Sequence, residues 1–421
     1  MNHTLLLDYQ PAPAGTGFIA RAMLTLTGTA PQNAARVPLN LSLVLDRSGS
    51  MSGEKLEAAT QAAAQLVRRL APEDRVNVVA FDDEIRTVAD ATAPEPGISL
   101  ADRILAIPAG GSTNLSGGWL RGRELAKASL TGQSVNRVLL LTDGQANCGI
   151  QDHDQLAKLC STAKAAGVTT STVGFGADYD EDLLKAMADA GGGNAWYIER
   201  ADQAADVFGE ELSGLLSLSA QNVTVLVKPA ANVNLVAVLQ SYPSHGGPAG
   251  LQIELGDLYA REPRVLVLEF LVQGTPGEEA SIGTLVVSAD VLKGDGAVEH
   301  VTATYPLASS LDAAGRTEPV IEREVLLARA SKARDEAARL KEDGDAKGSS
   351  AVVREAALRL SKSAFAKDPE FLEQAKDLRA MAKRLKEEAI DPSDIKYMKQ
   401  RAYNGSRGRQ AYDATLSRGE P

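Results

Sequence analysis

The sequence is poor in several residue types that mark particular classes of protein. Only two of its 421 residues are cysteines, Cys148 and Cys160, which is too few for a disulfide framework. Aromatic residues make up 4% of the chain, and the formal net charge is −11. The chain has few aromatic rings to stack on bases and an excess of negative charge that would repel phosphates. We therefore expect no nucleic-acid partner.

The sequence also lacks long apolar runs. The longest, such as Val138–Leu141 and Val265–Leu268, have the length of strands and fall far short of the ~20 residues of a membrane-spanning helix. The first residues contain neither the basic segment nor the apolar segment of a secretory signal. These features predict a protein without a membrane span that works in the cytoplasm, with reduced thiols.

What is present is the composition of a globular protein with more than one domain. Hydrophobic residues account for 44% of the chain and charged residues for 24%. The pattern predicts five regions: two strands that join a later β-sandwich (1–40), an α/β domain (41–217), the β-sandwich (218–312), a helical module (313–391) and an exposed basic tail (392–421). Since two strands cannot bury a core alone, the α/β domain is expected to be inserted in the sandwich.

The α/β region alternates apolar strands with amphipathic helices, which is typical of a doubly wound, mostly parallel sheet. The expected strands are Leu41–Leu45, Val76–Phe81, Val138–Thr142, Val168–Val173 and Asn194–Ile198, with Glu84–Val88 as an antiparallel edge. A first helix carries Leu56, Ala59, Ala63 and Leu66 on its apolar face, and others are expected at Leu115–Ala128, Gln155–Ala166, Glu181–Ala190 and Ala204–Leu216.

The rest of the chain has two further patterns. Residues 218–312 contain short alternating runs separated by turn signals, which indicate an antiparallel β-sandwich. From about residue 318 the composition favours helices, and breaks at Asp343–Ser350 and Pro369 predict a hairpin or a three-helix module. After Pro392 no apolar period remains, which predicts an exposed tail.

Three loops of the α/β region carry oxygen side chains where buried strands are expected to end. Asp46, Ser48 and Ser50 follow the first strand at alternate positions, Thr113 lies in a glycine-containing loop, and Asp143 follows a later strand. Because the carboxyl ends of parallel strands meet at one edge of a sheet, we expect these five side chains to lie together. Capping of helices and turns would explain the hydroxyls, but not two aspartates that end separate buried strands.

Hydroxyl and carboxylate oxygens are hard ligands, and this set has a low total charge. It suits Mg²⁺, with Mn²⁺ or Ca²⁺ as alternatives, better than Zn²⁺, which prefers imidazole or thiolate ligands. The four histidines lie in separate regions of the chain and add no ligand to this group. The sequence therefore predicts a divalent-cation site, with Mg²⁺ as the expected ion.

At this point the sequence resembles the von Willebrand factor type A (VWA) domain, whose metal-ion-dependent adhesion site (MIDAS) is built from Asp-x-Ser-x-Ser, a distant Thr and a distant Asp. All five positions have a match here, in Asp46, Ser48, Ser50, Thr113 and Asp143. The resemblance implies that the two serines and the threonine bind the metal directly, while the aspartates act largely through water. It also implies an open coordination position that an Asp or Glu of a partner protein fills.

The order of the regions resembles cytoplasmic bacterial members of the same superfamily and, more loosely, integrin β head pieces and inter-α-trypsin inhibitor heavy chains. The leading hypothesis is a metal-dependent protein–protein interaction module, not an enzyme. One alternative keeps the site but makes the chain an accessory subunit of a MoxR-like or chelatase-like AAA+ complex. Another is a metal-dependent hydrolase, which is disfavoured because only Asp178 remains as a candidate general base.

Two further segments near the expected strand ends need an interpretation. Gly174–Asp178 lacks the third glycine of a dinucleotide fingerprint, so we interpret it as a loop beside the metal site, with Asp178 or Tyr179 on the rim. The acidic run Asp82–Glu84 is expected to be a solvated turn, with a second cation site as the alternative.

The charges are unevenly distributed along the chain. Acidic residues outnumber basic ones between residues 41 and 310, whereas basic residues outnumber acidic ones after residue 311. An acidic surface attracts divalent cations but repels an acidic protein at long range. We therefore expect a partner that offers one carboxylate among basic residues, and the basic C-terminal region is an internal candidate.

Overall fold

The computed structural model describes residues 1–12, 17–29, 36–92, 99–131, 134–260, 262–273, 279–293, 297–310, 314–386 and 391–407. The chain divides into two compact units. One contains residues 30–222 and 290–300, and the other contains residues 1–29, 223–289 and 301–421. No helix within the described ranges is both long enough and apolar enough to cross a lipid bilayer.

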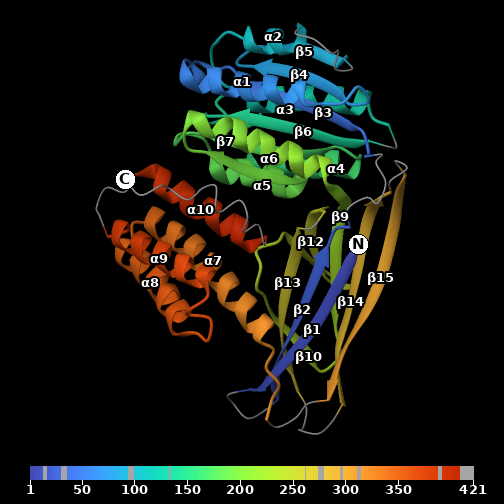
Figure 1. The fold of residues 1–421 in the computed structure, drawn as a ribbon, viewed down its shortest axis with the longest axis vertical. Helices are drawn as coiled ribbons and strands as arrows, with labels where there is room; N and C mark the ends of the chain where they lie inside the picture. Colours follow the sequence, from blue (N-terminus) through green and yellow to red (C-terminus); the bar gives the residue numbers. More distant parts are fainter. Residues whose placement is uncertain are drawn as a thin grey trace. The chain divides into compact units, whose positions relative to one another are not determined.

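A six-stranded sheet forms the centre of the first unit (Figure 1). Its strands run in the order β5 (Ile85–Thr92), β4 (Arg75–Phe81), β3 (Leu39–Asp46), β6 (Val135–Thr142), β7 (Thr169–Phe175) and β8 (Gly192–Ile198). All neighbouring pairs are parallel except β4 and β5. This mixed, mostly parallel sheet has the antiparallel edge that the sequence predicted at Glu84–Val88.

Helices cover the sheet, whose parallel strands are buried along almost their whole length. Side chains of β3, β4 and β6 form one buried cluster with α3 (Leu115–Ala128), α4 (His153–Ala165) and α5 (Glu181–Gly191). Helix α1 (Glu54–Arg68) packs against α2 (Ser99–Leu105) and α6 (Ala204–Leu216). The sequence patterns predicted each of these helices except α2, whose seven residues are too few for a clear period.

In the second unit, strands from the N-terminus pair antiparallel with strands from the later part of the chain. Strand β2 (Phe18–Thr27) pairs with β1 (Asn2–Pro11) and with β13 (Pro263–Val272), which in turn pairs with β10 (Val233–Val238). A five-stranded sheet has the order β11 (Ser244–Gly247), β12 (Gly250–Tyr259), β9 (Leu218–Pro229), β14 (Glu279–Leu292) and β15 (Val298–Ser310). Strand β2 therefore pairs with β1 on one side and, on the other, with β13, a strand more than 230 residues later.

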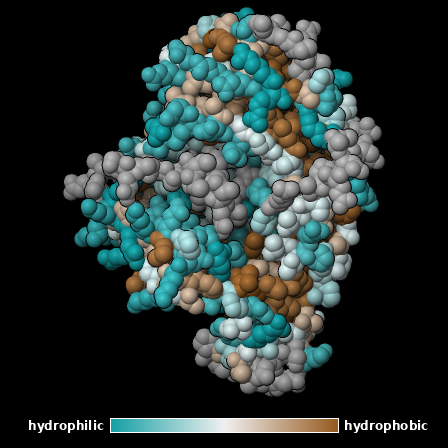
Figure 2. Space-filling model, viewed as in Figure 1, coloured by the Kyte–Doolittle hydropathy of each residue, from teal (hydrophilic) through white to brown (hydrophobic). Residues whose placement is uncertain are grey.

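Four helices follow the strands: α7 (Pro319–Glu342), α8 (Ala346–Lys362), α9 (Pro369–Arg384) and α10 (Pro392–Ser406). The break expected at Asp343–Ser350 is shorter than predicted, because Asp345 caps α8 by accepting a hydrogen bond from the Gly348 N–H (2.8 Å). Ser349 and Ser350 then lie inside α8, where their hydroxyls donate to the Ala337 and Ala382 carbonyls. Over the described helices the surface is mainly hydrophilic (Figure 2), with single exposed apolar side chains such as Leu372.

The expectation of an exposed tail from Pro392 on is wrong for residues 392–406. They form α10, which starts at the Asp391 cap with Pro392 in its first turn. Tyr397, Met398 and Tyr403 are buried. The helix packs against α7, and its buried residues include polar ones such as Gln400 and Arg401. At its C-terminal end the Arg407 guanidinium lies 4.3 Å from the centre of the Tyr403 ring. An apolar period does not detect that kind of packing, and residues 408–421 lie outside the described part of the chain.

A buried carboxylate in the second unit gives a pH-dependent contribution to stability. Asp8 lies opposite Arg21 on β2, which lies opposite Glu269 on β13. Its side chain is 2% exposed, and Arg21 approaches it only to 3.7 Å. Burial raises the pKa of Asp8 to about 6, although the Arg21 charge opposes the shift.

We expect Asp8→Asn to stabilise the protein at pH 7. In the wild type, a folded-state pKa above the unfolded value means that the free energy of unfolding falls as the pH rises from about 4 to 6. An asparagine stays neutral, so the variant should gain up to about 2 kcal/mol at pH 7 and nothing at pH 4. Urea unfolding of both proteins at the two pH values measures this. An equal effect of the substitution at pH 4 and pH 7 would contradict it.

Candidate metal centre

Strand β3 delivers the first three oxygen side chains to the edge of the sheet. It ends at Asp46, and the chain then turns through Ser48 and a short 3-10 helix (Gly49–Met51) before α1 begins. The Asp46 carboxylate is fully buried and accepts a hydrogen bond from the Ser48 N–H (2.8 Å) and another from the Thr142 hydroxyl. Ser48 is buried, whereas Ser50 is exposed to solvent.

The loop before α3 is joined to the β3 loop by backbone hydrogen bonds. The Gly49 N–H donates to the Gly111 carbonyl (2.8 Å), and the Gly110 N–H donates to the Arg47 carbonyl (2.7 Å). Asn114 caps α3 by accepting a hydrogen bond from the Gly117 N–H (3.0 Å). These contacts fix both loops through their backbones and leave the hydroxyl oxygens of Ser48, Ser50 and Thr113 for other partners.

Asp82 helps to hold these loops, so the prediction of a solvated acidic turn is wrong for this residue. Its carboxylate is buried and accepts hydrogen bonds from the Gly111 N–H, the Glu84 N–H and the Arg47 guanidinium, each at 2.9 Å. Burial favours the neutral acid, but the N–H donors and the Arg47 charge outweigh it and lower the pKa of Asp82. Asp82 is therefore an ionised anchor that positions the Thr113 loop.

The third loop follows β6 and brings in Asp143. Its carboxylate is fully buried, and its Oδ1 accepts a hydrogen bond from the Ser50 hydroxyl (2.7 Å). The Ser50 Oγ lies 3.1 Å from the Ser48 Oγ. The ammonium group of Lys55, in the first turn of α1, forms an ion pair with the Asp143 Oδ2.

The surroundings of Gly144 show how close the Thr113 hydroxyl lies to the Ser50 hydroxyl. A methyl group placed on Gly144 would be 3.3 Å from the Thr113 Oγ1 and 3.6 Å from the Ser50 Oγ. The Thr113 N–H is fixed by the Asn147 side-chain oxygen (2.8 Å). The structure thus brings the five residues named from the sequence together at the carboxyl ends of β3 and β6.

The spacing of the oxygens can be compared with that around a metal ion. In an octahedron with metal–oxygen distances of about 2.1 Å, neighbouring ligand oxygens lie about 3 Å apart. The contacts from Ser50 to Asp143 (2.7 Å) and to Ser48 (3.1 Å) are close to this value. Burial, with a smaller effect from the Asp143 charge, raises the pKa of Asp46 to about 6. A cation would supply the missing positive charge, so the residues present fit a hard divalent ion.

Four residues that support this arrangement were not identified from the sequence. Thr142 holds Asp46, and Asn147 holds Thr113. Asp82 holds the Gly111 loop, and Lys55 holds Asp143. Thr142 and Lys55 lie close in sequence to predicted ligands, which is the only signal that could have pointed to them. Asn147 and Asp82 act through backbone contacts that no sequence pattern encodes.

The loop after β7 lies beside the centre, but Tyr179 is not on its rim. Tyr179 is buried in the core cluster, with its ring 5.8 Å from the ring of Tyr197. Asp178 is exposed. Gly176, at φ +75°, approaches Lys55 instead, because a methyl group placed there would lie 3.5 Å from the Lys55 Nζ.

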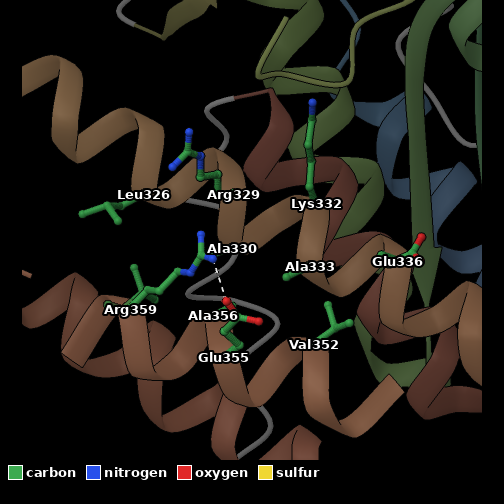
Figure 3. A pocket seen from close by; sticks show the side chains of 11 residues that line it. Leu326, Arg329, Ala330, Lys332, Ala333, Glu336, Val352, Glu355, Ala356 and Arg359 are labelled. Atoms are coloured by element: carbon green, nitrogen blue, oxygen red, sulfur yellow. Dashed lines mark hydrogen bonds and ion pairs between the residues drawn. The ribbon is translucent and has the colours of Figure 1, made fainter. Parts of the chain in front are cut away.

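A hollow of about 310 Å³ lies between α7 and α8 (Figure 3). Its charged side chains have partners: Arg359 donates to Glu355 (2.6 Å), Lys332 donates to the Val238 carbonyl (2.8 Å), and Arg329 contacts Glu269 (3.3 Å). In Figure 3, Arg329 and Lys332 point away from Val352. The Lys332 and Arg329 contacts tie α7 to β10 and β13, so these side chains are engaged in packing within the second unit.

Comparisons with known proteins identify the family of the α/β region. A family model described as the von Willebrand factor type A domain matches residues 40–210. An uncharacterized protein of Synechocystis sp. is 34% identical over 301 residues, which is 68% of this chain and 70% of that protein. Inter-alpha-trypsin inhibitor heavy chain H3 of Homo sapiens is 29% identical over 168 residues. That match covers 38% of this chain and only 19% of the heavy chain.

Solved structures share the fold over almost the whole chain. A von Willebrand factor type A protein from Catenulispora acidiphila has a TM-score of 0.73 at 17% identity and covers 97% of this chain and 96% of its own. The ArnB paralog VWA2 from Sulfolobus acidocaldarius has a TM-score of 0.61 at 17% identity, with 97% and 99% covered. At such identities the likeness concerns the fold alone.

Proposed function

The chain belongs to the von Willebrand factor type A domain family, and on that premise we propose that it is a protein-binding module. Domains of this family mediate metal-dependent protein interactions. In our proposal, a divalent cation, with Mg²⁺ as the expected ion, binds at Asp46, Ser48, Ser50, Thr113 and Asp143. A carboxylate of a partner protein completes its coordination, and no catalytic step is required.

One observation supports this proposal: the five side chains, from three loops, lie near one another at the carboxyl ends of β3 and β6. Asp143 accepts the hydroxyl hydrogen of Ser50, so the Ser50 oxygen can direct a lone pair at a cation. The Asp46 carboxylate already accepts hydrogen bonds from the Ser48 N–H and the Thr142 hydroxyl. Asp46 therefore suits the role of positioning the loop better than that of a direct metal ligand. The hydroxyls of Ser48, Ser50 and Thr113 are then the direct ligands.

Neutral hydroxyl ligands leave most of the positive charge on the cation. A cation held mainly by such ligands attracts an anionic group to its open position more strongly than one neutralised by several carboxylates. A partner Asp or Glu supplies that group. The excess of acidic residues between 41 and 310 favours a partner whose acidic residue is surrounded by basic ones.

A pull-down tests the proposal. Wild-type protein and Thr113→Val are immobilised and exposed to native lysate in Mg²⁺, and bound proteins are eluted with EDTA. We expect a set of proteins that binds the wild type, leaves in EDTA and is missing from Thr113→Val. Retention of the same proteins by the variant, or by the wild type in EDTA, would show that the metal does not capture the partner.

The eluted proteins also separate the two partner classes. An ATPase released by EDTA would favour the role of an accessory subunit in an AAA+ complex, whereas other proteins would favour a general adaptor.

Our proposal keeps the cytoplasmic setting expected from the sequence. The two free thiols, of which Cys160 is buried, support that setting. Burial raises the pKa of Cys160 to about 12, so this thiol stays neutral.

A further inference from the structure

Lys55 places an ammonium group beside the proposed metal ligands. Its ammonium group contacts the Asp143 Oδ2, while the Asp143 Oδ1 accepts the Ser50 hydroxyl. Asp143 is fully buried, and the Lys55 side chain is 31% exposed. The end of the lysine side chain also lies near Gly176, because a methyl group placed on Gly176 would be 3.5 Å from the Lys55 Nζ. Lys55 therefore lies close to both the β7 loop and the Asp143 carboxylate.

The position of this lysine in its helix is locally unfavourable. Lys55 is the second residue of α1, where the partial positive charge of the helix N-terminus disfavours a cation. The helix also has no side-chain cap, because Gly53 precedes it. The ion pair with Asp143 offsets this cost, which links the lysine to the metal centre and not to the stability of α1.

We propose that Lys55 tunes the centre, weakening its intrinsic affinity for the divalent cation and strengthening the loaded site's affinity for a carboxylate. This inference rests on the proposed function and adds a residue that sets its specificity. Asp46 and Asp143 carry two negative charges when ionised, and Lys55 neutralises one of them. A divalent cation then leaves the centre with a net positive charge, which draws a partner carboxylate. Without Lys55 the loaded centre is neutral.

This arrangement couples the two ligands. The carboxylate relieves the repulsion between Lys55 and the cation, so each ligand raises the affinity for the other by the same factor. A site of this kind holds its cation weakly alone and tightly when the partner is present. Lys55 therefore makes capture of the metal and capture of the partner cooperative.

Mn²⁺ titrations of the full chain by calorimetry test this, with sodium acetate as the carboxylate probe. We expect Lys55→Met to bind Mn²⁺ about tenfold more tightly than the wild type in the absence of acetate, since a nearby like charge is removed. Acetate should tighten Mn²⁺ binding to the wild type more than to Lys55→Met. Lys55→Arg keeps the charge and should behave as the wild type. The matched control is Lys127→Met, an exposed lysine in the last turn of α3.

The opposite result has a clear meaning. If Lys55 only anchors Asp143, Lys55→Met will bind Mn²⁺ no more tightly than the wild type, and that outcome overturns the inference while leaving the proposed function intact. Equal effects of acetate on the wild type and Lys55→Met would also overturn it. A wild type that binds no Mn²⁺ would overturn the proposed function itself, and this inference with it.

Discussion

Thr113→Val is expected to lose at least about tenfold in affinity for Mg²⁺ while keeping its fold, since a ligand hydroxyl is replaced by a methyl group of similar size. The Thr113 side chain is 3% exposed, and its Oγ1 faces the same point as the Ser50 hydroxyl, beside Gly144. The N–H contact with Asn147 belongs to the backbone and is unaffected by the change. The effect should therefore be on the metal and not on the loop.

Thermal unfolding with and without Mg²⁺ measures this effect. A ligand that binds only the folded state raises the melting temperature, by an amount that follows its concentration relative to Kd. The wild type should show a rise that EDTA reverses, and Thr113→Val should show little rise at the same concentration. Thr162→Val is the control, because it makes the same chemical change on the exposed side of α4. If Mg²⁺ raised the melting temperatures of both variants equally, Thr113 would not be a ligand of the metal.

Glu211→Ala is expected to destabilise the first unit by about 3–5 kcal/mol, because it leaves several buried donors without an acceptor. Glu211 on α6 is 1% exposed. Its carboxylate accepts the Ser171 hydroxyl (2.6 Å), the Asn194 side-chain amide (2.7 Å) and the Trp196 indole N–H (2.8 Å). These donors lie on β7 and β8, so one side chain fastens α6 to two strands.

Two further variants separate the lost hydrogen bonds from a general effect on α6. Glu211→Gln keeps the size and one acceptor oxygen, so we expect a smaller loss than for alanine. Glu210→Ala changes the neighbouring exposed residue and should cost less than about 1 kcal/mol. The free energies of unfolding from urea titrations should rank in that order. Similar losses for Glu210→Ala and Glu211→Ala would contradict the role of the buried network.

The α/β architecture could be predicted because several of its strands contain apolar runs, such as Val138–Leu141. The parallel strands Leu39–Asp46 and Val135–Thr142 are buried along their whole length, and the helices between them show a clear apolar stripe. The same strands fix the places where Asp46 and Asp143 leave the sheet. The five candidate ligands therefore followed from pattern and order alone.

The missed features depend on contacts that a linear pattern does not contain. Asp82 was assigned to solvent because acidic runs are usually exposed, yet backbone N–H groups and Arg47 stabilise it in the interior. Helix α10 lacks an apolar period because Tyr and Arg side chains, such as Tyr403 and Arg401, supply part of its buried surface. In both cases the folded chain buries charged residues that the sequence pattern assigned to solvent.

The central claim is that Ser48, Ser50 and Thr113 hold a divalent cation at the end of β3. Anomalous diffraction from crystals of the protein grown with Mn²⁺ locates the ion directly. We predict one strong peak about 2 Å from the hydroxyl oxygens of all three residues, with Asp46 and Asp143 around it. A peak bound elsewhere, or none at this position at saturating Mn²⁺, would contradict the claim.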